Sequence, residues 1–189
     1  MRGSDIDHED PSDWQGEDIY KRIHDIATTG NIKIKIAQDL PKKHMPNKDT
    51  EDLSKVYLNQ KSNNLNIYNM NQRKCFKNQL IFIWVYLFQI PGVEVRSLNF
   101  PELMGGGILH TKMWLVDRRH FYVGSANFDW RSLTQVKEMG VVVFDCPTFA
   151  EDMGKIFDVY WDLGEEGKKV PDTWPSSLST HINSENPLT

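Results

Sequence analysis

The sequence has few cysteines, no long apolar segment and no excess of positive charge. Its two cysteines, Cys75 and Cys146, are too few for a disulfide framework or a zinc site, and they leave the redox compartment open. The net charge of -4 argues against a protein that coats nucleic-acid duplexes with a generally basic surface. Any contact with nucleic acid therefore has to come from a local cationic groove.

Segments that would target the chain to a membrane are also lacking. The longest apolar run, residues 80–88, is far shorter than the ~20 residues that a transmembrane helix needs. Residues 1–13 are acidic and polar, without the apolar core of a signal peptide. The chain as given therefore predicts a soluble protein.

The sequence does contain a dense set of chemically active residues between positions 105 and 138. Six polar or small residues follow the pattern H-x-K-x4-D-x6-G-S-x-N: His110, Lys112, Asp117, Gly124, Ser125 and Asn127. Each residue type has a frequency of only a few per cent, so six fixed positions rarely arise together by chance. The joint spacing is therefore strong evidence of a functional site, whereas an isolated H-x-K would be weak.

The pattern also predicts local structure. Residues 108–116 are mostly apolar, which predicts a largely buried strand, and alternate side chains of a strand share a face. His110 and Lys112 would then point the same way, roughly 6.5 Å apart along the strand. Residues 117–120 form a polar break and residues 121–124 a second short apolar run, which predicts a hairpin.

Small residues close the second run of this hairpin. Gly124 and Ser125 stand where the lack of bulk lets backbone N–H groups approach an anion. Together with the strand geometry, they predict a phosphate pocket at the edge of a sheet.

These residue types suit phosphodiester chemistry without a metal or cofactor. The negative oxygens of a phosphodiester resist attack, so such a site must supply cations and donors that strengthen as charge develops. Lys112 provides a point charge, and Ser125 and Asn127 add neutral donors. His110 can attack phosphorus through a neutral ring nitrogen if its other nitrogen donates to an oriented acceptor, for which Glu138 is the candidate.

Each residue also has a structural interpretation. Asp117 suits a turn or a hydrogen-bonded strand end at least as well as a catalytic role. Ser125 and Asn127 are common turn residues, and Glu138 lies outside the core motif, where a surface carboxylate is the simpler interpretation. Phe121, Phe128 and Trp130 could serve as stacking or acyl platforms, although core packing is favoured for all three.

The flanking segments predict the α/β class, with helices packed on a mostly parallel sheet. Isoleucines at helical spacing predict a helix that ends at Gly30, and the alternating run after it predicts a strand with one buried face. Further elements are expected in this order: a short helix at 49–57, a strand at 91–100, a buried strand at 139–144 and a helix at 147–161.

Two segments depart from this alternation. Residues 57–89 are rich in Asn, Gln and Lys and end in an apolar octet, which favours an insertion, such as translated intron-like sequence, over a genuine long loop with a buried strand. From Glu165 the chain is polar and rich in proline. The expected organisation is one domain at 1–164, with 57–89 as a suspected insertion, and a linker or tail at 165–189.

The H-x-K-x4-D-x6-G-S-x-N motif resembles the signature of the phospholipase D superfamily of phosphodiesterases. Residues 106–142, 155–164 and 170–177 look like the first half of the animal phospholipases D three and four, an endolysosomal exonuclease branch. The resemblance implies a phospholipase D-like half with a mixed, mostly parallel sheet flanked by helices, lacking a first strand that would precede Arg2.

The resemblance also implies roles for the matching residues. His110 matches the nucleophile that forms a phosphohistidine, and Glu138 matches the glutamate that holds its ring. Asp117 matches a residue that is mainly structural. Enzymes of the superfamily place two such motifs face to face, one histidine attacking and the other protonating the leaving oxygen, and this chain contains one motif.

Three functions are consistent with a single motif. The first is a phosphodiesterase half-site acting on single-stranded nucleic acid ends, completed by a homodimer through the active site or by a longer chain. The second is a catalytically incomplete fragment or pseudoenzyme, and the third is phospholipid hydrolysis or transphosphatidylation. Relatives are single-pass membrane proteins, which implies the lumen of the endoplasmic reticulum or lysosome for a full-length protein, while this chain leaves the compartment unknown.

Overall fold

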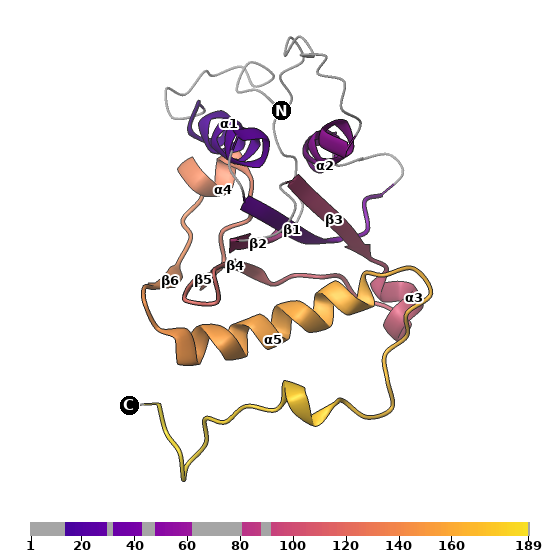
Figure 1. Ribbon diagram of the computed structural model, residues 1–189, viewed down its shortest axis with the longest axis vertical. Coiled ribbons are helices and arrows are strands. Elements are labelled where there is room, and N and C mark those ends of the chain that lie inside the picture. The colour runs from indigo at the N-terminus through magenta and orange to yellow at the C-terminus, as the bar shows by residue number, and fades with distance from the viewer. Residues whose placement is uncertain (1–13, 30–31, 43–47, 62–80, 88–91, 189) are drawn as a thin grey trace.

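The protein forms a three-layer α/β arrangement, which confirms the predicted fold class. The computed structural model describes residues 14–29, 32–42, 48–61, 81–87 and 92–188. Helices α1, α2 and α4 lie on one side of a six-stranded sheet, and the long helix α5 lies on the other (Figure 1). Within the described residues, no helix combines the length and apolar content that a membrane span requires.

The helices and strands alternate along most of the chain. In chain order they are α1 (Trp14–Thr29), β1 (Ile32–Asp39), α2 (Lys48–Lys61), β2 (Ile81–Leu87), β3 (Gly92–Leu98), α3 (Phe100–Met104), β4 (Lys112–Val116), β5 (His120–Gly124), α4 (Trp130–Thr134), β6 (Gly140–Val143), α5 (Pro147–Leu163) and the short 3-10 helix η2 (Ser176–Leu178).

The sheet has the strand order β3-β1-β2-β4-β5-β6. It is mixed, as expected, but it is not mostly parallel. The pairs β1–β3 and β2–β4 are parallel, whereas β1–β2, β4–β5 and β5–β6 are antiparallel. The hairpin of β4 and β5 accounts for one of the antiparallel pairs, because a tight turn joins only antiparallel strands. Strand β6 pairs antiparallel with β5 after the longer segment that carries α4.

The first helix packs on the sheet through residues four positions apart. Helix α1 ends where the sequence predicts, with Ile19 partly buried, Ile23 8% exposed and Ala27 fully buried against Ile34 of β1. Ile26 is 40% exposed, so it lies outside the buried stripe. The i, i+4, i+8 spacing defines the inward face of the helix.

Helix α5 covers the opposite face of the sheet. Its Phe157 and Trp161 are buried and stack on each other, with ring centroids 5.9 Å apart. They share a core with Met113 and Leu115 of β4, the strand of the motif. Burying a side chain as large as Phe157 contributes about 2–3 kcal/mol. The motif strand is thereby fixed by the aromatic stripe of α5.

Two parts of the suspected insertion belong to regular elements of the fold. Residues 57–61 form the last turn of α2, and residues 81–87 form β2, whose backbone pairs with both β1 and β4 inside the sheet. A continuous apolar sequence suits an interior strand with both faces covered. The remainder of 57–89, and the residues around Arg2, before which a further strand was expected, lie outside the described residues.

Strand β6 is exposed, so the prediction of a buried strand at 139–144 is wrong. Val141 and Val142 point to opposite faces of the sheet, yet they are 58% and 55% exposed. The flanking Met139 and Phe144 are 83% and 75% exposed. The physical reason is position, because β6 is the last strand of the sheet and pairs only with β5.

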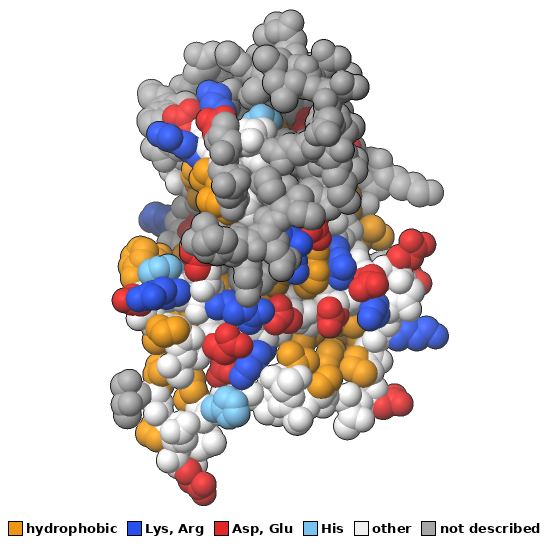
Figure 2. All heavy atoms as spheres, in the orientation of Figure 1, with side chains coloured by type: hydrophobic (Ala, Val, Ile, Leu, Met, Phe, Trp, Pro, Cys, Tyr) orange, Lys and Arg blue, Asp and Glu red, His pale blue; other side chains and the backbone are white. Residues whose placement is uncertain are grey.

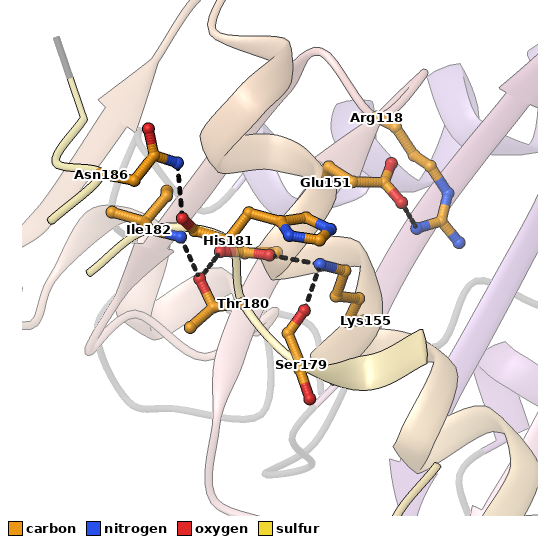
Figure 3. A network of polar contacts seen from close by, with 9 residues as sticks. Arg118, Glu151, Lys155, Ser179, Thr180, His181, Ile182 and Asn186 are labelled. Carbon is orange, nitrogen blue, oxygen red and sulfur yellow. Dashed lines mark hydrogen bonds and ion pairs between the residues drawn. The ribbon is translucent and has the colours of Figure 1, made fainter. Parts of the chain in front are cut away.

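The polar tail runs along α5 and is bound to it. The Nζ of Lys155 donates to Oδ1 of Asp152 at 2.7 Å and to the backbone oxygen of Ser179 at 2.8 Å (Figure 3). The hydroxyl of Thr180 donates to the other carboxylate oxygen of Asp152. Burial acts to raise the pKa of Asp152, but these hydrogen bonds outweigh it and hold the pKa below its usual value.

A buried carboxylate in α2 makes stability depend on pH. Asp49 is 4% exposed. Burial raises its pKa from 3.8 to about 7, and the neighbouring Asp52 acts in the same direction. Between these two values the folded protein keeps a proton that the unfolded chain loses. Stability that is fully present below 3.8 is therefore lost as the pH rises through about 7.

Asp49→Asn should therefore raise the free energy of unfolding at about pH 8, by about 4 kcal/mol at most, and change it little at about pH 4. Urea unfolding at both pH values measures the difference. Glu51→Gln is the matched control, because Glu51 is exposed on the same helix and does not contribute to the raised pKa of Asp49. A gain from Asp49→Asn that is equal at both pH values would contradict the assignment.

Candidate active site

The segment before β4 presents His110 at the surface. Strand β4 begins at Lys112, so the predicted strand at 108–116 starts four residues too early. Leu109 is 1% exposed, and its N–H donates to Oδ1 of Asp39, the last residue of β1, at 2.9 Å. His110 is exposed immediately after this anchor. The histidine is therefore held by its neighbours, although it lies outside a regular strand.

Two supporting residues were not predicted. Asp39 accepts the hydrogen bond from Leu109, and Tyr160 of α5 places its hydroxyl 3.3 Å from Oγ1 of Thr111. Together they fix the residues on both sides of His110. A carboxylate at the end of a predicted strand was the available signal for Asp39, whereas Tyr160 lies within the helix predicted at 147–161 and no sequence pattern links it to Thr111.

Lys112 lies directly beside the histidine. Its Nζ donates to the backbone oxygen of His110 at 2.8 Å and lies 3.2 Å from the ring atom Nδ1. Lys112 is only 6% exposed. Burial lowers its pKa below the usual value, while the nearby carboxylate of Glu138 acts in the opposite direction. The imidazole, the ammonium and the carboxylate are therefore electrostatically coupled.

Glu138 is held by Ser125. The Ser125 hydroxyl donates to Oε2 of Glu138 at 2.6 Å and has a longer contact of 3.2 Å to the backbone oxygen of Met139. The N–H of Met139 donates to the same hydroxyl at 2.9 Å, and the N–H of Ser125 donates to the Met139 oxygen at 2.9 Å. The structure thus pairs Glu138 with Ser125, whereas the resemblance implied pairing with His110.

The strand register brings these groups to one end of the sheet. Gly124, beside Ser125, pairs with Lys112 across β4–β5 and with Gly140 across β5–β6. A Cβ at Gly124 would lie 2.6 Å from the Met139 oxygen and 2.7 Å from the Gly140 Cα. The absence of a side chain at Gly124 therefore lets β6 approach.

Asn127 retains unused hydrogen-bonding capacity. Its Oδ1 is buried without a hydrogen-bond partner among the described residues. The next residue, Phe128, is 3% exposed and packs edge-on against Trp114 with ring centroids 4.7 Å apart. Asp129 then caps α4 by accepting from the N–H of Arg131 at 2.9 Å. These contacts fix the two residues that follow Asn127.

Asp117 lies away from this cluster. It follows the far end of β4, five residues and roughly 16 Å along the strand from Lys112. Asp117 and Arg118 have φ values of 53° and 50°, in a turn closed by a 3.0 Å hydrogen bond from the Arg119 N–H to the Val116 oxygen. Aspartate tolerates this left-handed conformation better than most residues. This position matches the turn interpretation of Asp117.

Aromatic residues of the motif region contribute to the core. Phe121 is 4% exposed and packs edge-on against Phe149 of α5 with ring centroids 5.2 Å apart, and Phe128 is similarly buried. Both therefore have the core role that the sequence favoured for them over a ligand platform.

The cluster brings together groups of the types that phosphoester chemistry uses. It offers an exposed imidazole, a buried cation, a hydroxyl and a carboxylate. The described residues include no group of three or more His, Cys, Asp or Glu side chains placed to hold a metal ion. On the face shown in Figure 2, Lys and Arg are interspersed with Asp and Glu around α5, so positive charge there is local.

Comparisons with known proteins agree with this chemistry. A family model described as "PLD3/4, PLD-like domain" matches residues 89–189. The chain is 35% identical over 188 residues to a 5'-3' exonuclease PLD3 of Homo sapiens, covering 100% of this chain and 31% of the human protein. It is 50% identical over 97 residues to a 5'-3' exonuclease PLD3 of Xenopus laevis, covering 51% of this chain and 20% of that protein.

A mouse relative matches the chain over a similar length. The chain is 50% identical over 97 residues to a 5'-3' exonuclease PLD4 of Mus musculus, covering 51% of this chain and 19% of that protein. The chain thus spans about a third or less of the length of the curated relatives that it matches.

Proposed function

This chain belongs to the PLD3/4 family of PLD-like domains, and we propose that it is the motif-bearing part of a phosphodiesterase that hydrolyses single-stranded nucleic acid ends. The observation that carries the proposal is the 3.2 Å approach of the Lys112 Nζ to Nδ1 of His110, beside the hydrogen-bonded pair of Ser125 and Glu138. A nucleophile, a cation and a carboxylate therefore meet where a phosphoryl group can bind.

The proposed reaction has two steps. Lys112 and Asn127 bind the phosphoryl oxygens, and a ring nitrogen of His110 with a free lone pair attacks phosphorus. The new N–P bond forms while the P–O bond to the leaving nucleotide breaks, and the leaving oxygen takes a proton from a second histidine. Water then attacks phosphorus, breaks the N–P bond and returns a proton to that second histidine.

The second histidine has to come from a second motif. We propose that it is supplied by another copy of this chain in a homodimer through the active site, or by further sequence in a longer chain. In the dimer, each protomer would contribute one His110 to a shared site on the two-fold axis. One protomer contributes a single motif, and therefore one of the two histidines that the proposed reaction requires.

The experiment combines activity with molecular size. The chain is incubated with 5'-fluorescent single-stranded DNA over a range of protein concentrations, while sedimentation measures the fraction of dimer. Release of labelled nucleotides that rises with the dimer fraction would support the proposal. A strictly monomeric, inactive protein that still binds the oligonucleotide would instead favour the catalytically incomplete fragment.

A lipid substrate is the alternative that one observation favours. The exposed apolar surface of β6, with Met139 at 83% and Phe144 at 75%, begins directly after Glu138. Such a surface could contact acyl chains beside the site. Release of headgroup from phosphatidylcholine vesicles, without cleavage of single-stranded DNA, would support phospholipid hydrolysis or transphosphatidylation.

A further inference from the structure

In the free protein, the groups of the site are paired in a way that opposes attack by His110. A lysine ammonium has three N–H donors and no acceptor. While Lys112 is charged, its 3.2 Å contact with Nδ1 requires that nitrogen to be the acceptor. The proton of a neutral ring then lies on Nε2, so neither ring nitrogen has a lone pair free for phosphorus.

The carboxylate that could reverse this tautomer is already occupied. Glu138 accepts from the Ser125 hydroxyl at 2.6 Å. A serine hydroxyl has a single proton to donate, so Ser125 cannot donate at full strength to Glu138 and to a phosphoryl oxygen at once. The Met139 N–H, 2.9 Å away, holds the Ser125 oxygen in place during such a change.

We propose that an anion bound between Lys112 and Ser125 breaks the Lys112–His110 and Ser125–Glu138 hydrogen bonds and thereby activates His110. This inference rests on the proposed function and adds a positioning role for Ser125. The anion attracts the Lys112 ammonium away from Nδ1. It also replaces Glu138 as the acceptor of the hydrogen bond from the Ser125 hydroxyl. The released carboxylate then accepts from Nδ1–H, the ring proton moves from Nε2 to Nδ1 by exchange with solvent, and Nε2 gains the lone pair that attacks.

The contacts and the charges favour this exchange. Glu138 accepts from the Ser125 hydroxyl at 2.6 Å and also acts electrostatically on the Lys112 ammonium, so the same carboxylate connects the two donors. Burial has lowered the pKa of Lys112, which means that the ammonium gains from a closer negative partner. The exchange requires the Glu138 side chain to rotate from the Ser125 hydroxyl to the ring of His110, which a change between staggered rotamers supplies.

The consequence is that His110 becomes nucleophilic only when a phosphoryl group is bound. The free ring presents an N–H at its exposed side and is protected from reaction with other electrophiles. The same exchange makes Ser125 a sensor of the bound phosphoryl group as well as one of its donors.

Nitrogen-15 NMR of the histidine rings tests the inference without turnover. The chain has six histidines, and His110→Gln identifies the resonances of His110. Two-bond couplings to the ring protons should show Nε2–H in the free protein and Nδ1–H after saturation with inorganic phosphate. An Nδ1–H ring in the free protein, an unchanged tautomer on saturation, or no phosphate binding would each overturn the proposal.

Two variants separate the positioning role from general structure. In Ser125→Ala, Glu138 has lost its serine donor and accepts instead from the Lys112 ammonium or from Nδ1–H of His110. Either change favours a proton on Nδ1, so Nδ1–H should appear without phosphate. Ser125→Thr keeps the hydroxyl and should restore the phosphate-dependent shift. If Ser125→Ala keeps Nε2–H, Ser125 does not hold the carboxylate. Loss of nuclease activity with an intact tautomer shift would contradict the proposed function alone.

Discussion

Replacing His110 with alanine should reduce phosphodiester hydrolysis by at least about 10⁴-fold, because removing a covalent nucleophile leaves only binding and electrostatic stabilisation. Lys112 is buried and fixed partly by the backbone oxygen of His110, which the substitution retains. The affinity for an oligonucleotide should therefore change little. Active preparations quenched in denaturant should contain phosphate bound to protein in the wild type and none in the variant.

His120→Ala is the matched control for this experiment. His120 begins β5 at the far end of the hairpin, where its Nδ1 accepts from the Asp145 N–H at 2.9 Å. It should leave the hydrolysis rate within a few-fold of the wild type. Equal losses for the two variants would show that folding, and not chemistry, depends on these histidines. Full activity in His110→Ala would reject His110 as the nucleophile.

The elements of the fold could be predicted where the pattern is periodic and local. The end of α1, the limits of α5 and the strand β3 follow closely from apolar spacing, and so does the hairpin of β4 and β5 apart from the start of β4. The exposure of β6 could not be predicted, because an apolar run has the same sequence whether or not another layer covers it. The parallel or antiparallel choice likewise depends on strand order, which periodicity does not encode.

The site could be predicted as a set of residues but not as a set of contacts. The motif spacing identified His110 and Lys112, and the structure places them 3.2 Å apart. The pairing of Ser125 with Glu138 joins residues 13 positions apart. It depends on the β5–β6 register and on one side-chain rotamer. The sequence indicated Glu138 as the partner of His110, whereas the close approach of Met139 to Ser125 brings the neighbouring carboxylate to the serine hydroxyl.

Gly124→Ala should be the most damaging small substitution at the site. The new Cβ would lie 2.6 Å from the Met139 oxygen, and the Tyr122 hydroxyl occupies the other side. Met139 cannot retreat freely, because two 2.9 Å hydrogen bonds join its backbone to Ser125. We expect a loss of about 1–3 kcal/mol in the free energy of unfolding. Glu138 should also lose its fixed position, since it lies just before β6, in the segment that has to move.

Denaturant unfolding measures this loss, and two further variants define its cause. Gly106→Ala is the control, because a Cβ there meets nothing within 4 Å, and it should be neutral or stabilising by a few tenths of a kcal/mol. Adding Tyr122→Leu to Gly124→Ala should not restore stability, because the collision with the Met139 backbone remains. Recovery in that double variant would assign the strain to the tyrosine ring. An unchanged unfolding midpoint for Gly124→Ala would show that β6 is free to separate from β5.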